Sequence, residues 1–308
     1  MLNDGDVPDR LVVTLDIECD ADGGPTWRYS SPLTFRGVEH GLGEVLGPML
    51  DELGACATLL VSNVVLKDQA SVALLRDLRG VELGSHLHGD FLPPDPRHID
   101  PAGAKTVENQ NEYSDDVERA KLVALGALFQ EGFGRSPTSF RAGRWSAAGR
   151  TASLLAELGY TADSSVSPHV HWCDGGRSVD YRCAPEQPYR PASADISRPG
   201  ELALWELPVS IVTPWWARRR PIWLRPSLSP ARLMRLVVAD MRRRHPPPRT
   251  FVVMLHNTEL TPGTSPHSRT PDDARVVARR LRDFLSWAMD DGIHPMTLAA
   301  AAEACASS

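Results

Sequence analysis

Cysteine is scarce in this sequence, and the few cysteines are not spaced for a structural role. The chain has 308 residues and five cysteines, an odd number, and no two of them form a C-x-x-C pair. This excludes the disulfide framework typical of small secreted domains and the zinc-knuckle pattern. A G-x-S-x-G elbow, a G-x-G-x-x-G turn and a phosphate-binding loop are also missing. Their absence argues against a serine hydrolase and a nucleotide-binding protein.

Long apolar runs and excess positive charge are also missing. No apolar stretch approaches the roughly 18 residues of a membrane span. The N-terminus, MLNDGDVPDR, is polar and acidic, unlike a secretory signal. The formal net charge is −6, which argues against general nucleic-acid binding. We therefore expect a soluble cytoplasmic protein that has no transmembrane segment and no nucleic-acid partner.

Two kinds of apolar segment alternate along nearly the whole chain. Short β-branched runs are typical of buried strands, and longer amphipathic stretches are typical of helices. The last helix is expected to follow a cap at Thr270–Asp273, and another to open with a Ser146 cap. The expected strands are 10–18, 56–63, 81–86, 138–143, 161–166, 202–212 and 250–256, and the expected helices are 43–54, 68–80, 114–134, 146–160 and 274–292.

This alternation predicts parallel strands joined by helical crossovers. About seven repeats indicate a closed or nearly closed (β/α) barrel, with an open doubly wound sheet as the alternative. Residues 168–200 are rich in Pro, Gly, Asp and Arg without periodicity, and we interpret them as a long loop insertion. Because no repeat or low-complexity linker divides the chain, residues 1–308 are expected to form a single domain.

Polar side chains follow the expected strands at their carboxyl ends, where active sites lie in both architectures. On an extended chain, residues two apart face the same side, so Asp16 with Glu18, or His86 with His88, could bind one cation. Zinc favours imidazole together with carboxylate. The strand-end groups are Asp16, Glu18, Asp20, His86, His88, Asp90, Arg141, Asp163 and His256, with Asn257 and Glu259 just beyond.

Ordinary structural roles are the alternative for each of these residues. An isolated H-x-H is more often a pair bonded to water and backbone. Asp16 could be a satisfied loop carboxylate, Arg141 its structural ion-pair partner, and His256 a strand-terminal histidine bonded to backbone. Because so many such groups follow strand ends together, a metal-binding or catalytic role is favoured.

Five segments carry a resemblance to a known family. TLDIE, ELGSHLHGD, SFRAGRW, GYTADSSVSP and FVVMLHNTELTPGTSP occur in the order of the five motifs of the polysaccharide deacetylase family. This family has the NodB-homology fold and is also called carbohydrate esterase family 4. The resemblance covers about residues 10–300. It implies a distorted (β/α)7 barrel, a divalent metal of the zinc type, and removal of acetyl groups from N-acetylated sugars.

Site roles follow from the same resemblance. Asp16 resembles the catalytic base and Arg141 the residue that orients it. His256 resembles the general acid and Asp163 the aspartate that pairs with it. The metal ligands implied by the motifs are to be found among Glu18, His86, His88 and Asp90.

The sequence departs from the usual motifs at two places. Ile17 occupies the second position of the usual aspartate pair, so Glu18 could take over as a ligand. The usual second motif is H-x-x-x-H, which puts Asp90 at the second histidine unless His88 shifts into that role. The DIE and HLH variants resemble an atypical branch of the family, so the ligand set stays open.

Tryptophans in or near loops are candidate sugar-stacking residues. Trp145, Trp215 and Trp216 are the expected substrate-binding residues, and burial against the barrel is an equally good interpretation. The stretch TPWWARRRPIW, residues 213–223, could meet an anionic substrate, a partner protein or a membrane surface.

These features favour a metal-dependent hydrolase that removes the acetyl group from an N-acetylated sugar in a glycan, glycolipid or glycoside precursor. One alternative is a hydrolase of another non-peptide C–N bond, such as a cyclic amide or ureide. The other is a catalytically inactive barrel that binds carbohydrate.

Overall fold

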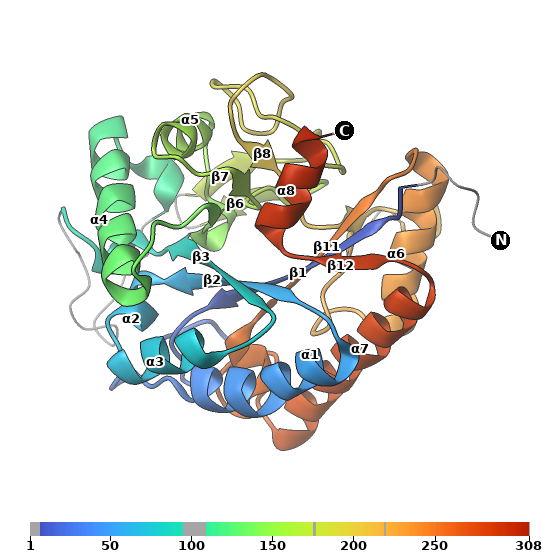
Figure 1. The fold of residues 1–308 in the computed structure, drawn as a ribbon, viewed down its shortest axis with the longest axis horizontal. Coiled ribbons are helices and arrows are strands. Elements are labelled where there is room, and N and C mark those ends of the chain that lie inside the picture. Colours follow the sequence, from blue (N-terminus) through green and yellow to red (C-terminus); the bar gives the residue numbers. More distant parts are fainter. Residues whose placement is uncertain (1–6, 95–108, 175–176, 219, 308) are drawn as a thin grey trace.

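A curled, eight-stranded parallel sheet forms the centre of the molecule (Figure 1). The computed structural model describes residues 7–94, 109–174, 177–218 and 220–307. The strand order is β11-β1-β2-β3-β4-β5-β8, and β12 pairs with the start of β1. The strands are β1 (Arg10–Ile17), β2 (Ala57–Ser62), β3 (Val81–Leu87), β4 (Ser139–Ala142), β5 (Ala162–Asp163), β8 (Trp205–Glu206), β11 (Thr250–His256) and β12 (His294–Met296).

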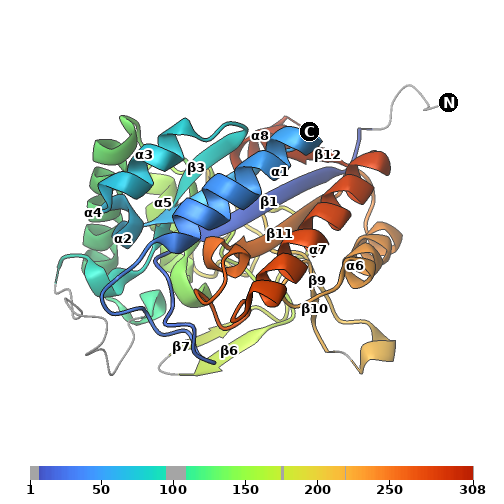
Figure 2. The same cartoon turned by 90° about the horizontal axis from the view of Figure 1, so that it is seen from below.

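Most helices pack on the outer side of this sheet, as expected for strands with helical crossovers, whereas the helix Leu298–Ala306 contacts β1, β5 and β8 (Figures 1 and 2). The connection after β1 begins as a π-helix, η1 (Gly37–Leu46), and continues as α1 (Gly47–Leu53). The other helices are α2 (Asn63–Leu66), α3 (Gln69–Asp77), α4 (Asp115–Phe133), α5 (Gly149–Glu157), α6 (Ala231–Arg244), α7 (Pro271–Asp290) and α8 (Leu298–Ala306).

The core lies on both sides of β1, whose eight residues are all buried. Its neighbours β2 and β11 are nearly as apolar, because parallel strands covered on both faces need continuous hydrophobic runs. Each fully buried Val, Leu or Ile side chain contributes about 1.5–3 kcal/mol. The centre of the sheet is therefore a rigid platform for the residues at its carboxyl edge.

A short segment bridges the opening between β8 and β11. The Ser210 N–H bonds the Val252 carbonyl at 3.1 Å, and the Met254 N–H bonds the Leu224 carbonyl at 3.1 Å. Next to these contacts, β9 (Ile211–Val212) and β10 (Ile222–Trp223) form a small antiparallel ladder. The expected distorted (β/α)7 barrel is confirmed.

Several local predictions need correction. Helix α5 begins at Gly149 rather than at 146, because the Ser146 hydroxyl donates to the Gly143 carbonyl and accepts from the Gln110 N–H. The expected strand 202–212 is broken into β8 and β9. The region 168–200 is not simply a loop: it contains an antiparallel hairpin of β6 (His171–Asp174) and β7 (Arg177–Asp180).

Helices α2, α6 and α8 and strands β10 and β12 were also not expected. The Thr270 cap of α7 is confirmed, since its hydroxyl accepts from the Asp273 N–H at 3.2 Å. Within the described residues, none of the helices has the length and apolar character needed to cross a bilayer.

Candidate active site

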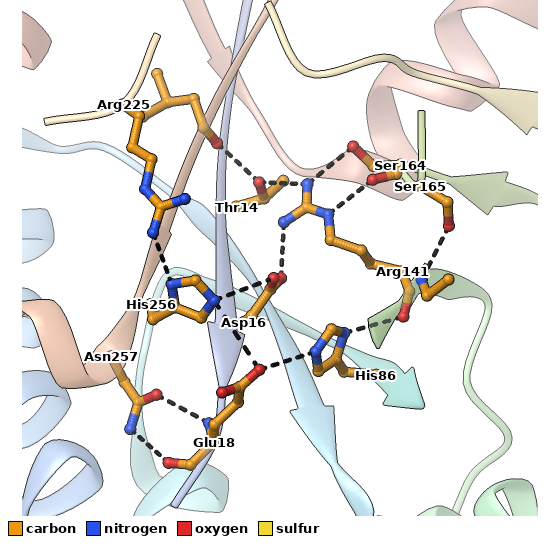
Figure 3. Close-up of polar contacts among 12 residues, drawn as sticks. Thr14, Asp16, Glu18, His86, Arg141, Ser164, Ser165, Arg225, His256 and Asn257 are labelled. Atoms are coloured by element: carbon orange, nitrogen blue, oxygen red, sulfur yellow. Dashed lines mark hydrogen bonds and ion pairs between the residues drawn. The ribbon is translucent and has the colours of Figure 1, made fainter. Parts of the chain in front are cut away.

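The carboxyl ends of β1 and β11 bring an acid and a base side by side (Figure 3). Asp16 and His256 are paired residues in the parallel register of these strands. The Nε2 atom of His256 lies 3.8 Å from Asp16 Oδ2 and 3.9 Å from Glu18 Oε1. Asn257 fixes the backbone of Glu18, accepting from its N–H at 2.9 Å and donating to its carbonyl at 3.0 Å. Strand pairing therefore sets the spacing of these groups.

Arg141, at the end of β4, holds Asp16 in place. Its guanidinium is fully buried and donates to Asp16 Oδ1 at 2.7 Å. The remaining donors bond the hydroxyl of Thr14 at 2.7 Å and the carbonyl and hydroxyl of Ser164 at 2.7 and 2.9 Å. Burial alone would raise the pKa of Asp16, but Arg141 lowers it below its usual value. Asp16 is therefore held as a carboxylate, and Arg141 bonds its Oδ1 rather than its Oδ2.

Glu18, His86 and His88 converge on one point, and they are the described side chains placed to hold a single ion. Glu18 Oε1 lies 3.1 Å from His86 Nε2 and 2.8 Å from His88 Nε2, and the two nitrogens are 3.0 Å apart. Tetrahedral zinc with bonds of about 2.0–2.1 Å separates its ligand atoms by roughly 3.3 Å. The triad needs only a slight outward shift to fit such an ion.

The position of the proton on the His86 ring is also suited to binding a cation at Nε2. Its Nδ1 lies 3.0 Å from the Arg141 carbonyl, which can only accept, so Nδ1 carries a proton. In the neutral ring, Nε2 then directs a lone pair at the Glu18 carboxylate. Although burial opposes it, Asp16 and Glu18 raise the pKa of His86, while burial lowers the pKa of His88. The same negative field that favours a proton here would favour a divalent metal.

His256 is oriented from its other side by Glu259 and Arg225. Its Nδ1 is 3.0 Å from Glu259 Oε1 and 3.1 Å from an Arg225 nitrogen, and the last two residues are themselves ion-paired. Burial would raise the pKa of Glu259, but Arg225 and His256 hold it well below its usual range. Glu259 is therefore a buried carboxylate that can accept a hydrogen bond from Nδ1 and fix the orientation of the ring.

Asp163 does not bond His256, and both residues belong to the described part of the chain. It accepts instead from the Ser165 hydroxyl at 2.5 Å and lies beside Glu206, its register partner on β8. Burial raises the pKa of Asp163 to about 6, and burial with the charge of Asp163 raises that of Glu206 well above its usual value. The expected pairing of Asp163 with His256 is thus not formed, and Glu259 occupies that place.

Asp90 lies outside the ion-binding triad, in the contact network behind it. Its carboxylate pairs with Arg144 at 2.6 Å, and Arg144 donates to the Tyr29 hydroxyl at 3.3 Å. The Tyr29 oxygen is 3.2 Å from His88 Nδ1. Asp90 thus acts on His88 through two intervening side chains.

The expected sugar-binding tryptophans are not together. Trp145 is 8% exposed and stacks in parallel with Trp172 at a centroid distance of 6.4 Å. Trp215 is 84% exposed between β9 and β10, and the side chain of Trp216 lies outside the described residues. Trp27, which we did not predict, is 46% exposed and lies over His256 with a centroid distance of 4.7 Å.

Some residues of the site were given no role from the sequence, although two of them carry a signal in it. Glu259 stands three residues after His256, so a single turn after the strand brings it back to the ring. Trp27 lies in the loop after the first strand, at the active edge of the sheet. Arg225 and Glu206 have no signal of this kind, because only the tertiary fold brings them to their partners.

Solved structures of low sequence identity share this architecture, whereas no protein-family model and no curated protein matches the sequence. One is a candidate polysaccharide deacetylase from Mycobacterium smegmatis, with 20% identity, a TM-score of 0.59, and coverage of 100% of this chain and 93% of the other. Another is a candidate glycoside hydrolase/deacetylase from Parabacteroides distasonis, with 12% identity, a TM-score of 0.65, and coverage of 97% and 71%. The chain has the polysaccharide deacetylase fold.

This fold does not by itself specify a reaction. A GH57 branching enzyme from Thermococcus kodakaraensis, in complex with glucose, is also similar, at 12% identity with a TM-score of 0.53 and coverage of 96% and 71%. The polysaccharide deacetylase fold therefore hosts different chemistries, and the reaction has to be argued from the site.

Proposed function

We propose that this chain is a metal-dependent hydrolase that removes the acetyl group from an N-acetylated sugar. The observation that carries the proposal is the position of Asp16. It is held by Arg141 between a Glu–His–His triad on one side and His256 on the other. A base, an acid and an ion-binding triad on one strand edge are the parts that amide hydrolysis needs.

The triad of Glu18, His86 and His88 would hold the metal. A divalent ion bound there would supply Lewis acidity, polarising the acetyl carbonyl and acidifying a water molecule. Zinc suits two imidazoles and one carboxylate. Asp90 is not proposed as a ligand, because its carboxylate is paired with Arg144.

Asp16 and His256 would divide the proton transfers between them. Arg141 occupies Oδ1 of Asp16, so Oδ2 accepts the proton of the attacking water. His256, oriented by Glu259, gives its Nε2 proton to the departing amine, which otherwise leaves poorly. Arg141 acts as a positioning residue throughout, because four of its five N–H groups bond protein atoms.

Trp27 would supply the sugar-binding face. Its half-exposed ring covers His256, where the sugar nitrogen has to lie when it receives a proton. Aromatic faces stack on the apolar side of sugar rings. Trp27→Ala should raise KM for the acetylated sugar, whereas Trp215→Ala should leave KM for a soluble sugar unchanged. Equal effects of the two changes would contradict this role.

Metal content and acetate release test the proposed function together. The purified chain should bind about one zinc-like ion and release acetate from at least one member of a panel of N-acetylated sugars. His86→Ala should lose both properties, and His294→Ala, which removes an exposed histidine on β12, should keep both. Full metal occupancy in His86→Ala would contradict the triad. Turnover of a cyclic amide or ureide, with none of any acetylated sugar, would favour the alternative hydrolase.

A further inference from the structure

The segment between β9 and β10 projects from the body of the molecule (Figure 2). It forms one 3-10 turn, η6 (Trp215–Ala217), and reverses at Arg218, whose φ is 52°. Its turn is closed by its own backbone: the Arg218 N–H bonds the Trp215 carbonyl and the Arg220 N–H bonds the Ala217 carbonyl. We call the described residues of this segment, 213–218, 220 and 221, the hairpin tip. No part of the proposed chemistry uses it.

An exposed indole dominates the hairpin tip. Trp215 is 84% exposed, whereas the other exposed large hydrophobic side chains of the described chain are 46–55% exposed. Leaving so large an apolar ring in water forgoes the stabilisation of burying it. Tryptophan in such a position is typical of interfaces where one end of the ring is apolar and the other wet.

Unpaired positive charge surrounds this indole. Arg218 and Arg220 are exposed, and neither forms an ion pair with any residue that the structure describes. Exposed arginines elsewhere are commonly paired, as Arg243 is with Asp240 and Arg182 with Asp180. The chain as a whole carries a net charge of −6, so the hairpin tip is a cationic point on an acidic protein.

We propose that the hairpin tip binds the surface of an anionic lipid bilayer. Trp215 enters the headgroup region, and Arg218 and Arg220 contact the negative phosphates. The positive charge of the two described arginines fits an anionic surface. Two arginines and one indole give weak, reversible and salt-sensitive attachment rather than insertion.

The hairpin tip and the site are joined by a short stretch of chain. Strand β10 leads within two residues to Arg225, which contacts His256. Attachment by the hairpin tip would hold the chain at the surface of the bilayer, where a lipid-linked acetylated sugar is presented. Access to a lipid-linked substrate rests on the proposed function, but the attachment to the bilayer does not.

Flotation of the full chain with vesicles tests the attachment. The chain should float with vesicles that mix phosphatidylglycerol into phosphatidylcholine, and not with phosphatidylcholine alone. The double variant Arg218→Glu/Arg220→Glu should reduce partitioning at least about 25-fold, since each arginine near an anionic surface contributes about five-fold. Trp215→Ser should also weaken it, and high salt should release the wild type.

A matched variant controls for net charge. Arg232→Glu/Arg279→Glu changes two exposed arginines on α6 and α7 by the same amount and should float like the wild type. Failure of the wild type to float with anionic vesicles would overturn the proposal, and so would equal losses in the two double variants. Both double variants should still release acetate from a soluble sugar, so failure of the attachment is distinguishable from failure of the proposed function.

Discussion

Asp16 and Asp163 each end a parallel strand of the same sheet and are buried, yet their environments act in opposite directions. Asp16 faces Arg141, which holds its pKa below the usual value. Asp163 lies beside Glu206, and burial raises its pKa to about 6. One aspartate is a fixed carboxylate, and the other belongs to a pair of acids that retains a proton.

The difference teaches that a strand-end position does not define a catalytic acid or base. The side chain next to each aspartate determines whether the charged or the neutral form of its carboxyl is favoured. A guanidinium stabilises the charged form and leaves one oxygen able to accept a proton, whereas a second carboxyl disfavours a second negative charge. Asp16 is thus suited to proton transfer near neutral pH, and Asp163 to holding β5 against β8.

The largest expected difference is in turnover. Asp16→Asn should fold normally and lose roughly 100-fold or more of acetate release, the usual scale for a general base. Asp163→Asn should stay within a few-fold of the wild type, because its carboxyl does not contact the site. Steady-state assays on the same acetylated sugar check both. Comparable losses of turnover in the two variants would show that the two aspartates do not differ in their roles.

Next in size is an effect that depends on the leaving group. His256→Ala should slow hydrolysis of an N-acetyl amide by roughly 100-fold or more, because an amine needs a proton in order to leave. It should slow an activated aryl acetate much less, since that phenolate leaves unaided. Equal slowing of amide and ester would show that His256 does not act as the acid.

A smaller effect should appear in the pH–rate profile. Glu259→Gln removes the carboxylate that contacts His256 Nδ1, so the alkaline limb should move to lower pH. Asp163→Asn should leave that limb in place. A shift with Asp163→Asn and none with Glu259→Gln would restore the pairing that the motifs imply.

The last prediction concerns stability, and the smallest effect on turnover is expected here. Asp163 in the folded chain keeps its proton up to about pH 6, whereas its ordinary pKa is 3.8. The folded state therefore binds more protons across this window, and the free energy of unfolding falls as pH rises from about 4 to 6. Asp163→Asn/Glu206→Gln should remove this slope, worth on the order of 1–3 kcal/mol.

Urea unfolding at a series of pH values measures that slope. Asp283→Asn/Glu303→Gln, which changes two exposed carboxyls, serves as the control and should unfold with the wild-type pH dependence. A wild-type chain whose stability rises across the same window would show that the pair of acids is ionised in the folded state.

Much of the sheet was predictable because its central strands are continuous apolar runs. β1, β3 and β11 fall within a residue of the expected ranges, and the cap of α7 was predicted from its sequence. β5 is only two residues long, and the expected strand 202–212 is broken, because these segments pair briefly at the opening of the barrel. The hairpin within 168–200 had a signal in its Gly-Gly pair.

The sequence predicted the kinds of residue in the candidate site, but not which of them contact one another. Residues two apart on a strand share a face, which brought Glu18 to the site, and the same spacing placed His86 with His88. The turn after β11 determines which carboxylate contacts His256. Matching the family motifs by position assigns this contact to Asp163. The left-handed backbone of Arg144, with φ of 55°, brings its guanidinium to Asp90, and no sequence pattern reveals such a turn.

The register between β1 and β11 has a practical consequence. Asp16 stands opposite His256 because seven successive residue pairs of the two strands are aligned. A slip by one residue would turn one of these two side chains to the other face of the sheet. The separation of Asp16 and His256 is thus set by the backbone hydrogen bonds between the two strands. Peripheral loops can be exchanged to suit other substrates while this spacing stays the same.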